Sequence, residues 1–119
     1  MKLTDAEWSI LEILWSGEEF SLKELTDALF VERKWSKNTV HTYLTRMAEK
    51  GLVNVKKGTS HPYSASVSYE ECASAERKHF LSRVYGGSTS ELITAFLKDG
   101  KMDGDELSRL KSLIDNMEV

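Results

Sequence analysis

A serine or threonine followed three residues later by glutamate recurs along this chain of 119 residues, and four of these pairs stand where a helical apolar pattern begins. In such a capping box the hydroxyl accepts a hydrogen bond from a first-turn backbone N–H, and the glutamate accepts one from the cap, so the pattern marks a helix start. The boxes are Thr4/Glu7, Ser21/Glu24, Ser68/Glu71 and Ser88/Glu91, with a related start at Asp103/Glu106 and a simple N-cap at Ser36. Six helix starts predict a mainly helical fold.

The first predicted helix runs to Trp15 and carries Trp8, Leu11 and Trp15 on one face. We expect it to stop at Gly17, because glycine tolerates the left-handed conformation that often closes a helix.

The next two predicted helices span residues 21–31 and 36–50, and the second ends before Gly51. Spacings of three and four residues place the apolar residues of each helix on one face. These residues are Leu22, Leu25 and Leu29 in the first helix and Val40, Leu44 and Met47 in the second. Both helices are therefore expected to pack on a core.

After Gly51 the apolar period changes from that of a helix to that of a strand. Val53 and Val55 alternate with polar residues, "GTSHP" is a turn, and Tyr63, Ala65 and Val67 alternate again. The pattern predicts a β-hairpin with a loop of about five residues. Three further helices are predicted over residues 68–85, 88–98 and 103–117.

Three helices followed by a hairpin is the element order of a winged helix-turn-helix. The predicted fold class is therefore mainly α, with a winged helix-turn-helix DNA-binding domain at residues 1–69 and a C-terminal helical dimerisation domain at residues 70–119. The helix over residues 36–50 takes the place of the recognition helix, and the hairpin takes the place of the wing.

Positive charge is concentrated in one short part of a chain whose net charge is -3. Residues 1–32 hold two basic and eight acidic residues, which gives -6, and residues 58–119 hold seven and ten, which gives -3. Residues 33–57 hold seven basic residues against Glu49 alone, which gives +6. Such a block can attract a polyanion even when the whole protein is acidic, although an ordinary solvated face is the alternative.

The outer face of the predicted recognition helix has the chemistry that reads a DNA major groove. It carries Lys37, Asn38, His41, Thr42, Thr45 and Arg46. Asparagine pairs bidentately with adenine, arginine pairs with guanine, and the threonine methyl contacts the thymine methyl. Lys56 and Lys57 at the wing are expected to bind phosphate, because lysine delivers charge without a fixed geometry. The alternative for Thr39 and Thr42 is that they only pack.

Other classes of protein find less support in the sequence. The three histidines are isolated, there is no phosphate-binding glycine loop, and the single cysteine, Cys72, has no zinc-ligand spacing around it. We therefore expect no catalytic residue, no metal and no cofactor. No apolar run approaches the ~18 residues that cross a membrane, so a cytoplasmic protein without membrane insertion is expected. A winged-helix protein-interaction module stays an alternative, but it should expose apolar residues where this helix carries polar ones.

Three segments of the sequence also resemble a known family. "LTDAEWSILEILW", "WSKNTVHTYLTRMAEKGLV" and "FLSRVYGGSTSELITAFL" are similar, in order and spacing, to segments of the BlaI/MecI/CopY family of penicillinase and copper-operon repressors. The resemblance covers nearly the whole chain. It implies a homodimeric winged-helix repressor of a palindromic operator in double-stranded DNA. It places operator contacts on Lys37, Asn38, Thr39, His41, Thr42 and Arg46.

The resemblance also suggests how the protein is released from DNA. The copper-responsive branch carries a C-terminal CxCxxxxCxC motif that this chain lacks, so a copper-operon repressor would need another signal. In the penicillinase branch, a membrane sensor protease leads to cleavage in the dimerisation region, typically at an Asn-Phe bond. The matching bond here is Ala95–Phe96, with alanine in place of asparagine.

The three C-terminal helices carry apolar stripes that so few residues bury poorly on their own. The residues expected to form a dimer interface are Phe80, Leu81, Val84, Leu92, Phe96, Leu107, Leu110 and Ile114. A second subunit is the natural cover for them. The alternative is that these helices pack back on the winged domain of their own chain.

Overall fold

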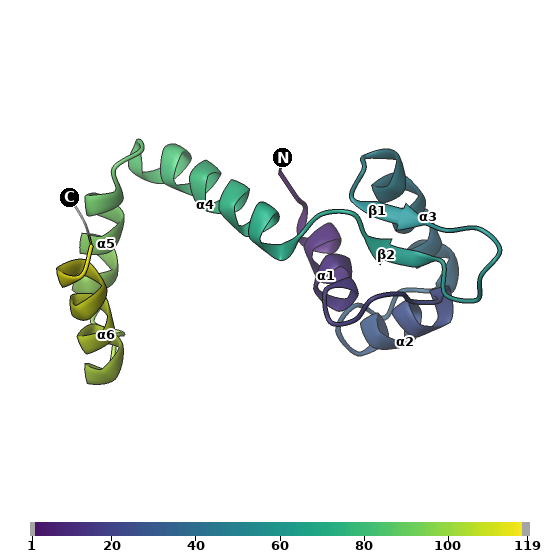
Figure 1. Cartoon of the computed structure of the whole chain (residues 1–119), viewed down its shortest axis with the longest axis horizontal. Helices are drawn as coiled ribbons and strands as arrows, with labels where there is room; N and C mark the ends of the chain where they lie inside the picture. The colour runs from purple at the N-terminus through teal and green to yellow at the C-terminus, as the bar shows by residue number, and fades with distance from the viewer. Residues whose placement is uncertain (1, 118–119) are drawn as a thin grey trace. The chain divides into compact units, whose positions relative to one another are not determined.

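The computed structural model describes residues 2–117 and confirms the predicted fold class (Figure 1). The elements are α1 (Asp5–Leu14), α2 (Leu22–Arg33), α3 (Lys37–Glu49), β1 (Val53–Val55), β2 (Tyr63–Ala65), α4 (Tyr69–Tyr85), α5 (Thr89–Lys98) and α6 (Gly104–Asp115). The chain divides into two compact units, Met1–Arg77 and Lys78–Val119, and the division falls within α4. The assignment of residues 70–119 to a dimerisation domain stays a prediction.

All six predicted helix starts are confirmed. Thr4, Ser21 and Ser68 form complete capping boxes with the glutamates that follow them. Ser36, Ser88 and Asp103 each accept a hydrogen bond from a first-turn backbone N–H, at 3.2, 3.2 and 2.8 Å. The caps succeed as predictors because each one is satisfied within three residues of sequence.

The predicted role of Gly17 is wrong. Helix α1 ends at Leu14, its C-cap residue Trp15 has an ordinary right-handed conformation, and Gly17 is absent from the residues with positive φ. A Cβ atom at Gly17 would instead lie 2.9 Å from the ring of Phe20. Glycine is therefore favoured here because it lets an aromatic ring pack against the backbone without displacement of that ring.

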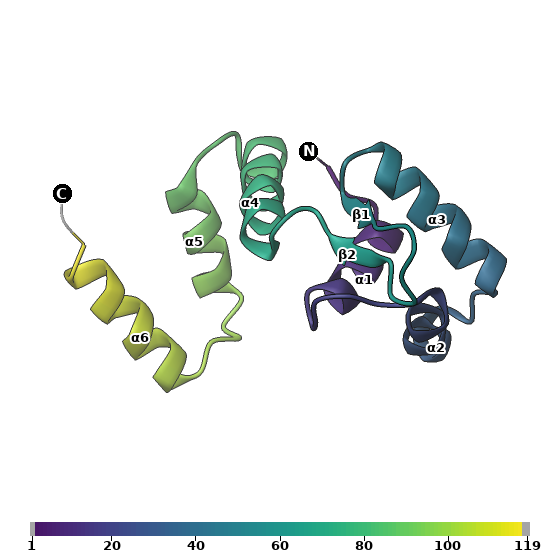
Figure 2. The ribbon, with the colours of Figure 1, turned by 45° about the vertical axis from the view of Figure 1, so that its right-hand side comes forward.

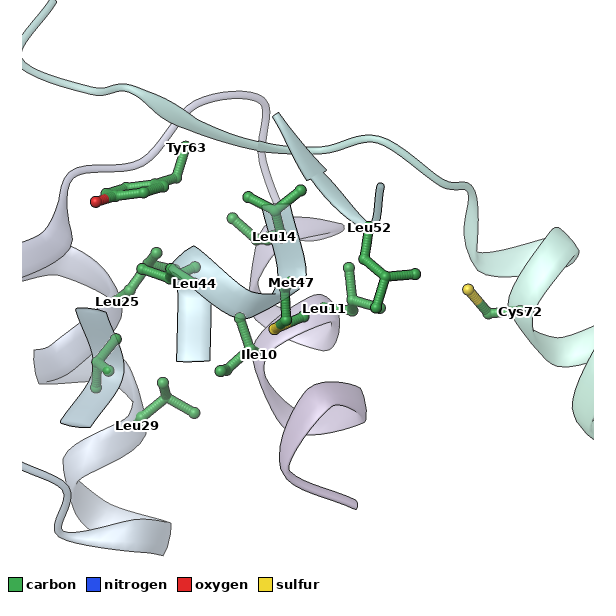
Figure 3. Close-up of a cluster of buried hydrophobic side chains, with 12 residues drawn as sticks. Ile10, Leu11, Leu14, Leu25, Leu29, Leu44, Met47, Leu52, Tyr63 and Cys72 are labelled. Atoms are coloured by element: carbon green, nitrogen blue, oxygen red, sulfur yellow. The ribbon is translucent and has the colours of Figure 1, made fainter. Parts of the chain in front are cut away.

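The core of the first unit is built by α1, α2, α3 and the hairpin. Figure 3 shows Leu44 and Met47 gathered with Ile10 and Leu11 among these buried side chains. The fully buried side chains are Ile10, Leu11, Leu14, Leu25, Leu29, Val40, Leu44 and Met47. The predicted inward faces of α2 and α3 thus point into one core, with Leu22 partly buried at its edge.

The wing is an antiparallel hairpin in which Val53 pairs with Ala65 and Val55 pairs with Tyr63. Its loop spans residues 56–62 and is closed by a 2.8 Å hydrogen bond from the Lys56 N–H to the Pro62 carbonyl. Phe20 adds an isolated bridge to Tyr63, through backbone bonds of 2.8 and 3.0 Å. This bridge ties the segment before α2 to the wing.

The first turns of α4 belong to the winged unit. The Trp15 indole N–H donates to the Val67 carbonyl at 2.9 Å, and the ring of Trp15 meets Tyr69 edge-on at 5.4 Å.

Cys72 is buried and points toward Leu52 (Figure 3). Burial raises the pKa of the Cys72 thiol, with a smaller contribution from the neighbouring charge of Glu71. A protonated, buried thiol is expected to pack as a small apolar side chain.

The second unit has no buried core of its own among the residues that the structure describes. From Lys78 to Met117 no residue is buried. Figure 2 shows α5 and α6 of this unit. A cavity of about 550 Å³ lies between α5 and α6, lined by Ile93, Phe96, Leu110 and three residues of the connecting segment. Within residues 2–117, no helix combines the length and the apolar character needed to cross a bilayer.

Candidate nucleic-acid interface

Helix α3 has one buried face and one exposed polar face. Val40, Leu44 and Met47 are fully buried in the shared core, where α3 packs against α2 and β1. The exposed residues are Lys37, Asn38, His41, Thr42, Thr45 and Arg46, which we call the α3 polar row. The structure therefore brings together all six residues that were read from the helix face, and the hydrophobic core sets the direction in which they point.

Two threonines of the α3 polar row use their hydroxyl hydrogens within the helix. Thr42 Oγ1 donates to the Asn38 carbonyl at 2.9 Å, and Thr45 Oγ1 donates to the His41 carbonyl at 3.0 Å. This back-bonding leaves the oxygen lone pairs and the methyl group facing solvent. Thr42 and Thr45 are thus better suited to contact a thymine methyl than to donate to a phosphate.

Thr39 differs from the α3 polar row because it is half-buried. Its backbone N–H donates to Ser36 Oγ at 3.2 Å, and the two hydroxyl oxygens lie 3.1 Å apart. Thr39 therefore completes the N-terminal cap of α3. The first turn holds no acidic residue, so the positive end of the helix dipole is not neutralised there.

The N-terminal end of α3 is held by an aromatic stack. The ring of Trp35 lies 4.7 Å from the ring of Tyr43, and the Arg33 guanidinium lies 5.3 Å from the Trp35 ring. Arg33 also donates to Ser9 Oγ at 2.9 Å on α1. Arg33 belongs to the basic block of the sequence, but here it supports the turn, and no local pattern indicated these contacts.

The C-terminal end of α3 is held by an ion pair with α1. Lys50 Nζ lies 2.7 Å from Glu7 Oε2, and Glu7 is only 4% exposed. Burial alone would raise the pKa of Glu7, but hydrogen bonds from Lys50 and from the Thr4 backbone, together with the Lys50 charge, hold that pKa below its ordinary value. Glu7 is therefore a buried carboxylate that is ionised and paired.

Lys56 and Lys57 are exposed at the start of the wing loop, in the same compact unit as α3. The other end of this loop is tied back, because His61 Nε2 lies 3.2 Å from Glu24 Oε1 at the start of α2. No sequence pattern indicated that contact, which joins residues 37 positions apart.

The remaining predicted residues lie in the second unit. Phe80, Val84, Phe96, Leu107 and Ile114 are exposed, whereas Leu81, Leu92 and Leu110 are partly buried. The Ala95–Phe96 peptide bond lies inside α5, and Phe96 is 57% exposed. Across residues 2–117 the structure brings no three His, Cys, Asp or Glu side chains close enough to hold a metal ion.

Comparisons with known proteins place this geometry in a wider context. The sequence model of a family described as penicillinase repressor matches residues 3–116. The methicillin resistance regulatory protein MecI of Mammaliicoccus sciuri is 25% identical over 114 residues, which cover 95% of this chain and 93% of that protein. The penicillinase repressor of Bacillus licheniformis is 24% identical over 115 residues, which cover 96% and 90%.

A solved structure, that of a MarR/EmrR family transcriptional regulator from Acinetobacter sp. ADP1, is similar with a TM-score of 0.42 and 18% identity. The alignment covers 97% of this chain and 78% of that one.

Proposed function

Because the chain belongs to the penicillinase repressor family, we propose that it is a homodimeric transcriptional repressor that binds a palindromic operator through α3 and the wing. The observation that carries this proposal is the α3 polar row, six exposed side chains that can pair with bases or phosphates on a helix whose opposite face is fully buried. A rigid backing of this kind presents side chains to a groove with little loss of entropy on binding.

Charge supports double-stranded DNA as the ligand. Residues 33–57 carry +6, and α3 and β1 lie within this block. Lys56 and Lys57 on the wing loop add charge beside the DNA backbone, where they would strengthen binding regardless of sequence. The protein-interaction alternative would need an apolar face on α3, and the exposed positions of the α3 polar row are all polar or charged.

The second unit supports the homodimer. Its eight predicted interface residues remain exposed or partly buried within one chain, and this unit contains no buried residue between Lys78 and Met117. A second copy of the same unit would cover this apolar surface in a self-complementary way. Two recognition helices in one dimer would then read half-sites about one or two helical turns apart.

Release by proteolysis at Ala95–Phe96 is the regulatory part of the proposal, with a membrane sensor protease or its effector as the further partner. A protease needs an extended substrate, so α5 must open locally before this bond is cut. Helix α5 spans only Thr89–Lys98 and contains no buried residue, so local opening is favoured over opening of the winged core.

The test begins with selection of bound duplexes from a random DNA pool, followed by affinity measurements on the recovered sequence. We expect Arg46→Ala to weaken binding to the recovered duplex and to relax its sequence preference, at about 1 to 3 kcal/mol for one lost bidentate contact. Lys57→Ala should weaken binding to all duplexes alike and lower the salt slope by about one. Lys111→Ala, an exposed lysine of α6, is the matched control and should change neither.

Two outcomes would contradict the proposal. Recovery of no preferred duplex, with unchanged affinity in both variants, would remove the α3 polar row as a reading surface. A strict monomer by sedimentation at micromolar concentration would remove the dimer.

A further inference from the structure

We propose that Glu7 and Lys50 form a counterion pair that keeps Arg46 free to contact DNA. This inference rests on the proposed function of the α3 polar row. It makes Lys50 a positioning residue that acts through Arg46 and not through its own contact with DNA.

The buried carboxylate of Glu7 has a strong need for partners. One oxygen accepts a 2.9 Å hydrogen bond from the Thr4 backbone N–H, and the other accepts one of 2.7 Å from Lys50 Nζ. A carboxylate that is 96% hidden from solvent cannot rely on water for its counter-charge, and an unpaired buried charge is strongly destabilising. Lys50 is the residue that supplies this charge.

Arg46 is placed to compete for the same carboxylate. Arg46 lies in the last turn of α3 and Lys50, four positions later, is the C-cap of that helix in a helical conformation, so their side chains lie on one side of the helix. Both line a recess of about 160 Å³ that is also lined by Thr4, Glu7, Tyr43 and Met47. A guanidinium binds a carboxylate with two parallel hydrogen bonds, which makes it a stronger partner than an ammonium group.

In the structure Lys50 is the residue that pairs with Glu7. Arg46 is exposed, and it forms no ion pair or side-chain hydrogen bond with any other residue in the range 2–117. Without the Lys50 charge, the ionised Glu7 would draw the guanidinium into the recess. A side chain that is paired with Glu7 cannot at the same time reach a base edge, so Arg46 would be lost to DNA although it is still present in the sequence.

The experiment measures affinity for the duplex recovered from the random pool, at one fixed salt concentration, in a small set of full-length variants. Lys50→Met should weaken binding about fivefold or more, close to the effect of Arg46→Ala, because both variants lose the same arginine contact. Adding Glu7→Gln to Lys50→Met should restore the affinity to within about twofold, because a neutral amide no longer attracts Arg46. Glutamine also keeps the capping box with Thr4.

Lys37→Met is the matched control, because it removes an exposed lysine from the other end of the same helix. Its effect should add to that of Arg46→Ala and should not be rescued by Glu7→Gln. Lys50→Met, in contrast, should add less than about twofold to Arg46→Ala, because sites that act through one group are not additive.

Thermal unfolding of each variant is followed in parallel. If Lys50→Met is unfolded at the temperature of the binding assay, Lys50→Gln replaces it, since its amide can still donate to Glu7 without carrying charge. Unchanged affinity in the folded Lys50 variant, or a loss that Glu7→Gln does not rescue, would overturn the inference. If Arg46→Ala itself leaves the affinity unchanged, the proposed DNA contact of Arg46 is wrong, whatever the Lys50 variants do. Failure of the proposed function is thereby distinguished from failure of the proposed role of Lys50.

Discussion

Replacing Phe96 with alanine removes a large apolar ring from the second unit, where we place the dimer interface. An aromatic side chain buries about 200 Å² when fully covered, and Phe96 is 57% exposed in the single chain. At about 25 cal/mol per Å², covering the exposed part is worth about 3 kcal/mol per copy. In a two-fold symmetric dimer both copies lose the ring, so the full effect is about 6 kcal/mol.

We expect the measured loss to be smaller, because a partner rarely covers the whole of an exposed ring. If half of the exposed surface is covered, the dimer loses about 3 kcal/mol, which raises its dissociation constant about 100-fold. Sedimentation equilibrium over a range of protein concentrations measures this constant directly. Circular dichroism of the variant checks that α5 and α6 still form.

Phe30 provides a closely matched control. It is a phenylalanine that is 56% exposed, but it lies on α2 in the winged unit. Phe30→Ala removes the same ring with the same exposed fraction and should leave the dimer dissociation constant unchanged. The reasoning is refuted if Phe96→Ala changes dimerisation no more than Phe30→Ala does while both variants remain folded.

Three further changes test the winged unit by urea or thermal unfolding. Because its pKa is lowered, Glu7 stabilises the fold at pH values above the ordinary glutamate pKa, and this contribution is lost as the pH falls through the lowered pKa. The difference in unfolding free energy between wild type and Glu7→Gln should therefore shrink between neutral pH and about pH 2. A difference that stays constant with pH would contradict this prediction. Trp15→Phe deletes the 2.9 Å hydrogen bond to the Val67 carbonyl and should lower the free energy of unfolding by about 1 to 3 kcal/mol. An unchanged stability would show that this hydrogen bond contributes nothing. Gly51→Ala adds a Cβ at a residue with φ +80° and no other atom within 4 Å of that Cβ. The substitution should lower the free energy of unfolding by about 1 to 2 kcal/mol through backbone strain alone. An unchanged stability would show that the end of α3 adjusts its conformation.

Local patterns predicted the elements well because each pattern is satisfied by nearby residues. The cap at Ser36, the stop at Gly51 and the spacing of Val40, Leu44 and Met47 were enough to define α3 and its exposed face. The same reasoning failed at Gly17, where the sequence suggested a left-handed cap and the structure places the Phe20 ring against the backbone. A close approach between two segments leaves no periodic signal in the sequence.

The sequence by itself determined where helices begin, which face of α3 is polar and where positive charge is concentrated, because capping, periodicity and composition act over a few residues. Only the tertiary structure decided which charged groups are available. Arg33 is held under Trp35, and Lys50 is held by Glu7, 43 residues away, while Arg46 remains unpaired among the described residues. Pairing depends on distance and burial in three dimensions, and those are set by how α1 and α3 pack on their shared core.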